Sequence, residues 1–553
     1  MKLLFIARHY TYFRNYDSAL RELASRGHQI HLAVEVVDKL GAEAAVDALA
    51  RDCPGITYGM VPPRQADTWS GVAQGLRLGL DYLRYLEPFY DTAPLRRVRA
   101  HDRTPRLLLA LAHPPLLGGA LWRGFYERCL HRVDAFVPPP ASIVEFVREH
   151  RPDAVLVTPL VDLGSQQIDY VRAAKLLGIP SCLPVWSWDH LTSKAYLRDR
   201  PERVLVWNET QRREAVDVHG VPEDSVIVTG AQCFDHWFTR TPSRTRETLC
   251  AERGFDPQQP IVLYVCTGLI KGSPREPQFV REWLETIRSS GDPVLATCNV
   301  LVRPHPAQTE DWQDVDLSEF GPVSVWGGNP IDERTRSDYF DALYHSAAVV
   351  GLNTSAFIEA GIVGREVLTI LEPRYHDNQE GTAHFQYLLQ IGGGLLRVGR
   401  DRPTHVAQLG EALRRPVTGE HPHQAFLEAF VRPGGLGHAA TPDFVAAVEG
   451  LGNCRVSRAH VIGASWRRAA FGRIAQWGGR VAGETLVSSP RELAVIARDR
   501  EVRAVKQRRE DDARVVREAA KAARRAERER ELTEHRAARA AQEAEKKAMR
   551  QAR

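Results

Sequence analysis

Short apolar runs alternate with helical segments along most of the 553 residues, and the alternation occurs in two separate blocks. Residues 3–7 form a continuous apolar run, a helix ending near Arg26 follows, and residues 29–34 form the next run. Short continuous apolar runs are typical of parallel strands that are buried on both faces. Strands that alternate with helices therefore predict a parallel sheet.

The pattern stops at the polar, proline-bearing residues 240–260, which predict a linker, and then starts again. A chain of this length exceeds the ~250–300 residues at which one hydrophobic core stops growing. We therefore expect two Rossmann-like domains, residues 1–240 and 255–450, that face each other across a cleft at the carboxyl ends of their strands. The other expected elements are helices 143–149 and 167–177 and strands 154–158 and 179–185 in the first block, and strands 261–266, 298–302, 348–352 and 366–371 and helices 278–289, 338–346 and 355–361 in the second.

The composition changes beyond residue 450. Residues 455–490 carry tryptophans and arginines at near-helical spacing and predict a basic amphipathic segment. Residues 491–553 are mostly Arg, Glu, Ala and Lys, which predicts a long charged helix; a coiled coil, a single helix and disorder all remain open. For 459–553 we expect peripheral contact with an anionic membrane or a partner helix.

Composition restricts the remaining classes. The net charge is only +4, so we expect no nucleic-acid partner. The eight cysteines are scattered without a C-x-x-C pair, as expected in a reducing, cytoplasmic compartment. The N-terminal apolar run is too short for a signal peptide, and no stretch of about 18 apolar residues predicts a spanning helix. The expected location is cytoplasmic, with peripheral contact at the inner face of the membrane.

Three polar motifs of the second block each follow a predicted strand. Thr267, Gly268 and Lys271 form a turn that can offer backbone N–H groups and a positive charge to a phosphate. Arg303 and His305 alternate with prolines, which restrict the backbone and hold both side chains at the sheet edge. The alternative for the first motif is an ordinary βα loop, and for His305 a structural histidine.

The third motif joins a strand to a helix. Asn353, Thr354 and Ser355 can cap that helix, and its N-terminus with hydroxyl side chains is a candidate anion site. Glu359 lies one turn into the helix, within reach of a ribose hydroxyl. Capping alone is the alternative.

Together these motifs resemble the C-terminal domain of GT-B transferases, and the second and third resemble the CDP-glycerol glycerophosphotransferase and capsule-polymer transferase group. The resemblance in motifs covers residues 260–400. The first half of the chain resembles these transferases only in its architecture. It implies a nucleotide-diphosphate donor at the strand-end turns, and a loop containing Gln379 that meets the transferred group. The sequence Asn353-Thr354-Ser355-Ala356 departs from that group, which has an acidic-aromatic pair before its serines, so the resemblance does not extend to glycerol.

A polar and aromatic stretch after strand 179–185 is the best acceptor site in the first half. It contains Trp186, Trp188, Asp189, His190 and Lys194, which combine stacking area with directional hydrogen bonds. Asp189 or His190 is a candidate general base. The alternative to sugar stacking is that the tryptophans have a structural role.

His9, in the loop after the first strand, is a rival general base. We expect no metal and no cofactor, because no D-x-D pair follows a strand and GT-B transferases use basic residues and helix dipoles instead.

The function that these residues predict is transfer of a sugar from a nucleotide-diphosphate donor to a cell-surface polysaccharide or lipid-linked acceptor. The alternatives are a CDP-polyol polyolphosphotransferase, a hydrolysing nucleotide-sugar epimerase and a non-catalytic GT-B scaffold protein.

Overall fold

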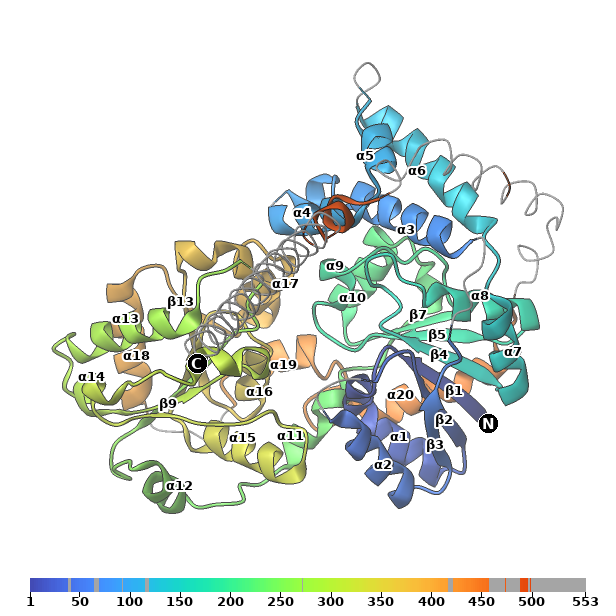
Figure 1. Ribbon diagram of the computed structural model, residues 1–553. Helices are drawn as coiled ribbons and strands as arrows, with labels where there is room; N and C mark the ends of the chain where they lie inside the picture. The colour runs from blue at the N-terminus through green and yellow to red at the C-terminus, as the bar shows by residue number, and fades with distance from the viewer. Residues whose placement is uncertain are drawn as a thin grey trace, which may run out of the picture.

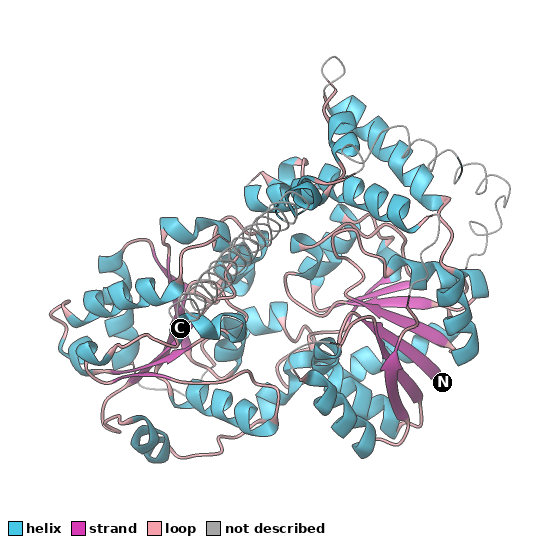
Figure 2. Ribbon diagram, viewed as in Figure 1, coloured by secondary structure: helices cyan, strands magenta, loops and turns pink. Residues whose placement is uncertain are grey.

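The computed structural model describes two α/β domains, each built on a fully parallel sheet (Figures 1 and 2). It describes residues 1–37, 41–63, 69–91, 93–114, 119–270, 272–415, 421–456, 473, 488–495 and 498. Most of the predicted basic segment 455–490 and of the tail 491–553 lies outside these residues.

The first sheet has seven strands in the order β3-β2-β1-β4-β5-β6-β7. This is the strand order of a Rossmann fold with one strand added. The chain adds strands toward one edge from β1 to β3 and then toward the other edge from β4 onward, so the switch point lies between β1 and β4. The strands are β1 (Lys2–Ala7), β2 (Gln29–Val34), β3 (Ile56–Met60), β4 (Ala154–Thr158), β5 (Ser181–Pro184), β6 (Arg203–Val206) and β7 (Val226–Val228).

The second sheet has six strands in the order β10-β9-β8-β11-β12-β13, which is again the Rossmann order. The predicted fold class of two Rossmann-like domains is confirmed. The strands are β8 (Ile261–Val265), β9 (Asn299–Arg303), β10 (Val323–Val325), β11 (Ala348–Gly351), β12 (Glu366–Ile370) and β13 (Arg397–Gly399).

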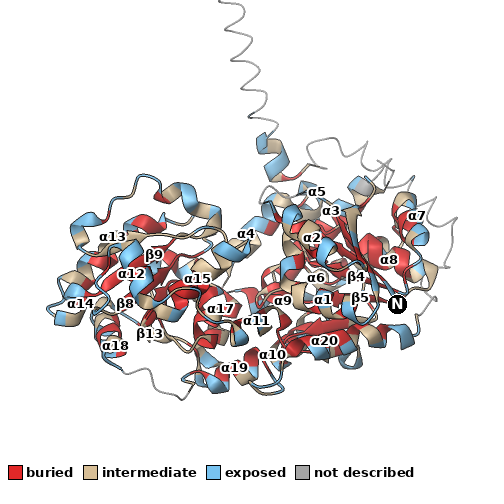
Figure 3. Cartoon of the chain, turned by 90° about the horizontal axis from the view of Figure 1, so that it is seen from below, coloured by how far each residue is buried: buried red, intermediate tan, exposed pale blue. Residues whose placement is uncertain are grey.

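Helices pack on both faces of each sheet. The central strands are buried, whereas the edge strands β3, β7, β10 and β13 are only partly buried (Figure 3). Those of the first domain are α1 (Asp17–Ser25), α2 (Ala42–Asp52), α3 (Ser70–Arg84), α4 (Pro94–Arg103), α5 (Arg106–Ala112), α6 (Ala120–Ala135), α7 (Ala141–His150), α8 (Ile168–Leu177), α9 (His190–Ser193), α10 (Glu209–Arg213) and α11 (Asp235–Thr239). Those that follow are α12 (Arg246–Arg253), α13 (Glu276–Arg288), α14 (Pro293–Thr297), α15 (Glu333–His345), α16 (Ala356–Ile362), α17 (Ala383–Gln390), α18 (Arg402–Arg414), α19 (Gln424–Phe430) and α20 (Ala440–Glu449).

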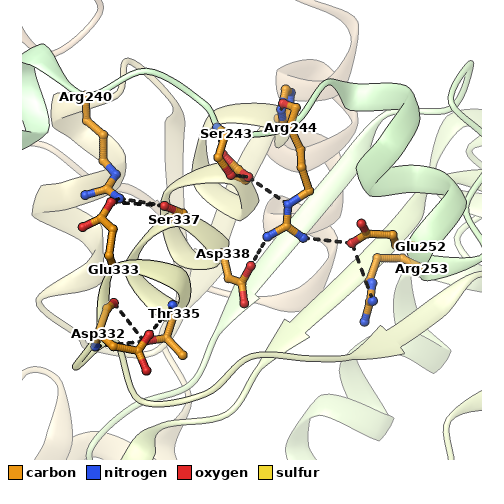
Figure 4. Close-up of polar contacts among 12 residues, drawn as sticks. Arg240, Ser243, Arg244, Glu252, Arg253, Asp332, Glu333, Thr335, Ser337 and Asp338 are labelled. Carbon is orange, nitrogen blue, oxygen red and sulfur yellow. Dashed lines mark hydrogen bonds and ion pairs between the residues drawn. The ribbon is translucent and has the colours of Figure 1, made fainter.

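Residues 240–260, predicted as a linker, connect the two domains and contain the helix α12. Ser243 donates from its N–H and Oγ to the carboxylate of Asp341 at 2.8 and 2.6 Å. Arg244 pairs with Glu252 at 2.8 Å and also with Asp338 (Figure 4). These contacts fix the connection between the domains to α15.

The last helix of the second half returns to the first domain. Phe444 and Val448 of α20 belong to the hydrophobic cluster that includes Leu20 of α1 and Phe5 of β1. Asp235 accepts hydrogen bonds from the backbone N–H of Thr441 at 2.7 Å and holds the crossing segment in place. The predicted second domain, 255–450, thus extends into the core of the first.

The charged tail begins on the first domain. Ser489 and Glu492 form reciprocal hydrogen bonds, with the Ser489 N–H donating to the Glu492 carboxylate at 2.8 Å and the Glu492 N–H to Ser489 Oγ at 3.2 Å. This pattern is a capping box, and it starts the helix at Pro490. The Arg106 N–H donates to the Ser488 carbonyl at 3.3 Å, which joins the start of the tail to α5. None of the described helices is long and apolar enough to cross a membrane.

Candidate functional site

The loops that follow the three central strands of the second sheet lie next to one another. Strands β9, β8 and β11 are neighbours in the sheet, so their carboxyl ends bring the three predicted motifs to one edge. Thr267 joins two of these loops: its N–H donates to Glu276 at 2.8 Å, and its Oγ1 accepts from the Asn353 N–H at 3.1 Å. The side chain of Thr267 is therefore occupied within the protein and holds the loop after β11 in position.

His305 has one ring nitrogen in use within its own loop. Its Nδ1 accepts from the Ala307 N–H at 3.2 Å, so the neutral ring carries its proton on Nε2. Nε2 lies 3.1 Å from the point that a Cβ on Gly268 would occupy, so a side chain there would crowd the ring. Burial lowers the pKa of His305 and the charge of Arg14 lowers it further, although a side-chain hydrogen bond with Gln308 opposes the shift. His305 is thus a neutral imidazole at neutral pH, with an N–H on the side of Gly268.

Arg303, Tyr339 and Glu359 form a buried cluster beside His305. The Arg303 guanidinium lies 4.4 Å from the Tyr339 ring centroid and donates to the Gly328 carbonyl at 2.7 Å. Its Nη1 is buried and has no hydrogen-bond partner within the described ranges. The Tyr339 hydroxyl donates to Glu359. A buried guanidinium nitrogen of this kind is a candidate donor to a ligand oxygen.

Glu359 is a carboxyl that titrates near neutral pH. Burial raises its pKa to about 7, although the Tyr339 hydroxyl and the charges of Arg14 and Arg303 oppose the shift. A carboxyl with this pKa is half ionised at neutral pH and can either accept or donate a hydrogen bond.

Arg14 brings a positive charge from the first domain to these residues. It lies on the short helix η1 (Tyr10–Tyr16) that follows β1, and its charge acts on both His305 and Glu359 of the second domain. The sequence placed Arg14 in the loop after the first strand but did not single it out. Its proximity to Pro-clamped His305 depends on how the domains meet, which no local pattern encodes.

The turn after β11 differs from the predicted anion site. Ser355 is exposed and makes no side-chain capping bond, while Thr354 Oγ1 accepts weakly from the Ala356 N–H at 3.4 Å. Helix α16 has only seven residues, too few for a strong dipole at its N-terminus. Asn353 donates to the Asn378 carbonyl at 2.6 Å, so its amide nitrogen supports the neighbouring loop.

Two further predicted residues do not form part of this cluster. Gln379 is 1% exposed and its amide nitrogen donates to the carbonyls of Leu352 at 3.1 Å and Ile370 at 2.8 Å. Its Oε1 accepts from the Glu372 N–H at 3.1 Å. The structure therefore contradicts a ligand-binding role for Gln379, because the backbone uses both ends of the amide. Lys271 lies outside the described residues.

Asp189 organises the loop after β5. It accepts from Ser187 Oγ at 2.6 Å and Ser193 Oγ at 2.5 Å, and Lys194 Nζ lies 3.5 Å away. Burial alone would raise the pKa of Asp189, but Lys194 and these hydroxyls outweigh it and hold the pKa well below its usual range. Such a weakly basic carboxylate is a poor general base at neutral pH, because the most effective base has a pKa near the working pH.

His190 is a structural histidine, which contradicts its prediction as a general base. It is fully buried, its Nε2 donates to the Pro159 carbonyl at 2.7 Å, and its Nδ1 accepts from the Trp186 N–H at 3.4 Å. Both ring nitrogens are thus used by the backbone. Burial lowers the pKa of His190 to about 4, so the ring is neutral.

The aromatic side chains of this loop have different surroundings. Trp188 is 6% exposed and contacts His384 of α17 edge to face at 4.7 Å, so it packs between the domains and offers no stacking surface. Trp186 is partly exposed and contacts Tyr12, whose ring lies 4.6 Å from the ring of His9. Trp186, Tyr12 and His9 therefore form the aromatic patch on the first-domain side.

Glu214 is a buried acid that the sequence did not reveal. It lies on a single π-helical turn, η3 (Glu214–Val218), and accepts from the Tyr387 hydroxyl of α17. Burial raises its pKa to about 8. Nothing in the surrounding sequence distinguishes Glu214 from a surface glutamate, and its contact with Tyr387 forms only where the two domains meet.

No family model matches the chain, and no curated protein matches it. Among solved structures, it is similar to a putative UDP-N-acetylglucosamine 2-epimerase from Listeria monocytogenes (12% identity, 81% of this chain, 96% of that one, TM-score 0.46). A glycosyltransferase from Rickettsia africae is 9% identical over 81% of this chain and 98% of its own, with a TM-score of 0.47.

WaaG, a glycosyltransferase involved in lipopolysaccharide biosynthesis, is 11% identical over 81% of this chain and 100% of its own, with a TM-score of 0.43. On its own strand orders, this chain has two successive Rossmann-like domains with a final helix that returns to the first, which is the GT-B architecture.

Proposed function

We propose that the protein is a transferase that moves a sugar from a nucleotide-diphosphate donor to a cell-surface polysaccharide or lipid-linked acceptor without a metal ion. The observation that carries the proposal is the group formed by Gly268, Arg303, His305 and Glu359 at the strand ends of the second domain, together with the charge of Arg14 from the first. These residues combine two guanidinium groups, a neutral imidazole N–H and a carboxyl.

In this proposal the second domain binds the donor. Arg14 and the His305 Nε2–H stabilise the charge that develops on the leaving diphosphate, since fixed donors are most effective where charge appears in the transition state. Glu359 accepts from ribose hydroxyls, and Gly268 leaves room for a phosphate beside the imidazole. Thr267, Asn353, Thr354 and Ser355 shape the adjoining turns.

The acceptor side of the proposal uses the first domain. Trp186 and Tyr12 supply an apolar surface for a sugar ring, and Lys194, which Asp189 holds in place, supplies a hydrogen-bond donor at its edge. His9 is the proposed general base, because Asp189 has too low a pKa and the backbone occupies both nitrogens of His190.

Thermal unfolding in the presence of UDP, GDP, CDP and their sugar derivatives tests the donor part. A ligand that binds the folded state raises the melting temperature according to RT ln(1 + [L]/Kd). We expect one nucleotide diphosphate to raise it, and His305→Ala to weaken turnover with the matching sugar nucleotide. Absence of any nucleotide effect on the melting temperature would support a non-catalytic scaffold. Formation of an epimerised sugar without an acceptor would show that the protein is an epimerase and not a transferase.

A further inference from the structure

Exposed apolar side chains are concentrated on one part of the first domain. Six of the twelve large hydrophobic residues that are exposed in the described chain fall between residues 89 and 125. Leu121 is 92% exposed and Phe125 is 53% exposed. The six are Phe89, Val98, Leu107, Leu111, Leu121 and Phe125. All but Phe89 lie on the segment from α4 to α6, residues 94–135, which we call the helical insert.

Two of the exposed pairs are spaced to lie on one face of a helix. Leu107 and Leu111 are four residues apart on α5, and Leu121 and Phe125 are four residues apart on α6. Trp122 Nε1 of α6 donates to the Leu111 carbonyl of α5 at 2.9 Å, which holds the two helices together. Figure 1 shows α5 and α6 standing out from the rest of the first domain, away from both sheets. The exposed pairs are therefore presented on a projecting, ordered element.

The helical insert is also strongly basic. Residues 94–135 contain eight arginines and three acidic residues, a net charge of +5, whereas the whole chain has a net charge of only +4. Arg99, Arg106, Arg128 and Arg132 are exposed. Apolar and cationic side chains thus share the same helices, with few carboxylates to neutralise the arginines.

Buried ion pairs anchor the insert to the body of the domain. Arg77 of α3 pairs with Asp134 of α6 at 3.3 Å and with Asp169 of α8 at 2.7 Å, and all three side chains are buried. Arg96 of α4 donates to the Ser193 carbonyl at 2.9 Å, in the loop that also holds Asp189. The exposed face of the insert is therefore fixed relative to the acceptor-side loop.

We propose that the helical insert docks the protein on an anionic lipid bilayer. Leu107, Leu111, Leu121 and Phe125 enter the boundary between headgroups and acyl chains, and the neighbouring arginines bind lipid phosphates. A bilayer fits these observations better than a protein partner does, because apolar side chains interspersed with arginines match an apolar layer covered by negative charge. This inference does not depend on the proposed transferase activity.

The test is flotation of the full-length protein with vesicles of phosphatidylcholine alone and with vesicles that contain 30% phosphatidylglycerol, roughly the anionic content needed for an electrostatic contribution. We expect binding to the anionic vesicles and about tenfold weaker binding to the neutral ones. The double variant Leu121→Ser, Phe125→Ser should bind the anionic vesicles about tenfold more weakly than the wild type, because two apolar anchors are lost. Arg99→Gln with Arg106→Gln should weaken binding by a similar factor.

The control is Leu176→Ser, which replaces an exposed leucine, 41% accessible, on α8 outside the insert. It should bind like the wild type, and because Leu121 and Phe125 are already exposed, all variants should keep the wild-type melting temperature. The charged tail is present in every variant, so equal binding by wild type and insert variants would assign any membrane contact to the tail and overturn the proposal.

Two other results would also overturn it: no binding of the wild type to anionic vesicles, or equal binding to both kinds of vesicle. A concentration-dependent dimer in the absence of lipid, abolished by Leu121→Ser with Phe125→Ser, would identify the insert as a contact between two copies instead.

Discussion

The loops after β5 and β9 each place a histidine at the carboxyl end of a buried strand, and the two histidines have opposite surroundings. His190 uses both ring nitrogens to bind backbone groups, while His305 binds one backbone N–H through Nδ1 and has Nε2 on the side of Gly268. The loops differ in proline content. Pro304 and Pro306 restrict the backbone around His305, whereas the residues from Trp186 to Lys194 contain no proline.

This difference has a general meaning for polar side chains in loops. Where prolines fix the backbone, polar side chains are not needed to hold the loop and can bind a ligand. Where they do not, side chains such as Asp189 and His190 form the hydrogen bonds that hold the loop. Two acids after strand ends also differ: the pKa of Asp189 lies well below its usual range, but burial raises that of Glu359, on α16, to about 7.

The largest effect that we expect is on stability, from His190→Ala. This substitution removes two hydrogen bonds, leaves the buried Pro159 carbonyl without its donor and creates a cavity. The free energy of unfolding should fall by about 3 kcal/mol. Urea unfolding measures it, with His305→Ala as the matched control, which should lose less than about 1 kcal/mol. Equal losses in the two variants would remove the contrast between the loops.

The second effect is on turnover, from His305→Ala. Loss of one preorganised donor to the leaving diphosphate should lower kcat by about 10²-fold, roughly 2.7 kcal/mol in the barrier, without loss of fold. Steady-state kinetics with the matching sugar nucleotide measures it. His305→Gln restores an N–H donor and should recover part of the rate. Unchanged turnover in His305→Ala would exclude His305 from the reaction.

The third prediction uses pH to separate Glu359 from Asp189. The pKa of Glu359 is raised on folding, so its contribution to stability is complete below its unfolded value near 4.5 and is lost as pH rises through about 7. The pKa of Asp189 is lowered, so its contribution is present above its unfolded value near 3.8 and is lost as pH falls below it.

Urea unfolding between pH 3 and 8, compared with Glu359→Gln and Asp189→Asn, measures both. Glu214 and Glu276, whose pKa values are raised to about 8, act in the same direction as Glu359 and are unchanged in both variants. If Glu359→Gln keeps the wild-type decline between pH 5 and 7, the carboxyl does not titrate there.

Sequence reasoning was most successful where local pattern determines structure. The apolar runs predicted β1, β2 and β4 within one residue at each end, and the strand-end rule placed Arg303 and His305 correctly at the edge of β9. It missed β3 and β6, and also the edge strands β7, β10 and β13, which have only three residues each and too little alternation to detect.

The failures concern contacts between distant parts of the chain. Gln379 and His190 are polar residues in strand-end loops like the others, and only their buried hydrogen-bond partners show that they are structural. Arg14 and Glu214 gain their surroundings from the opposite domain. Residue types and spacing describe neither kind of contact, because both depend on how the folded loops and domains pack together.

The smallest expected effect is that of Thr267→Val, which tests whether the loops after β8 and β11 depend on each other. Valine keeps the shape of threonine but removes the Oγ1 that accepts from the Asn353 N–H at 3.1 Å. The buried N–H loses its partner, so the free energy of unfolding should fall by about 1 kcal/mol. Thr248→Val is the control, since Thr248 is exposed on α12 and its replacement should change stability by less than about 0.5 kcal/mol. Because the loop after β11 adjoins Glu359, Thr267→Val should also weaken nucleotide binding more than Thr248→Val does. Wild-type stability and binding in Thr267→Val would mean that β8 and β11 alone hold these loops in place, as Pro304 and Pro306 do for His305.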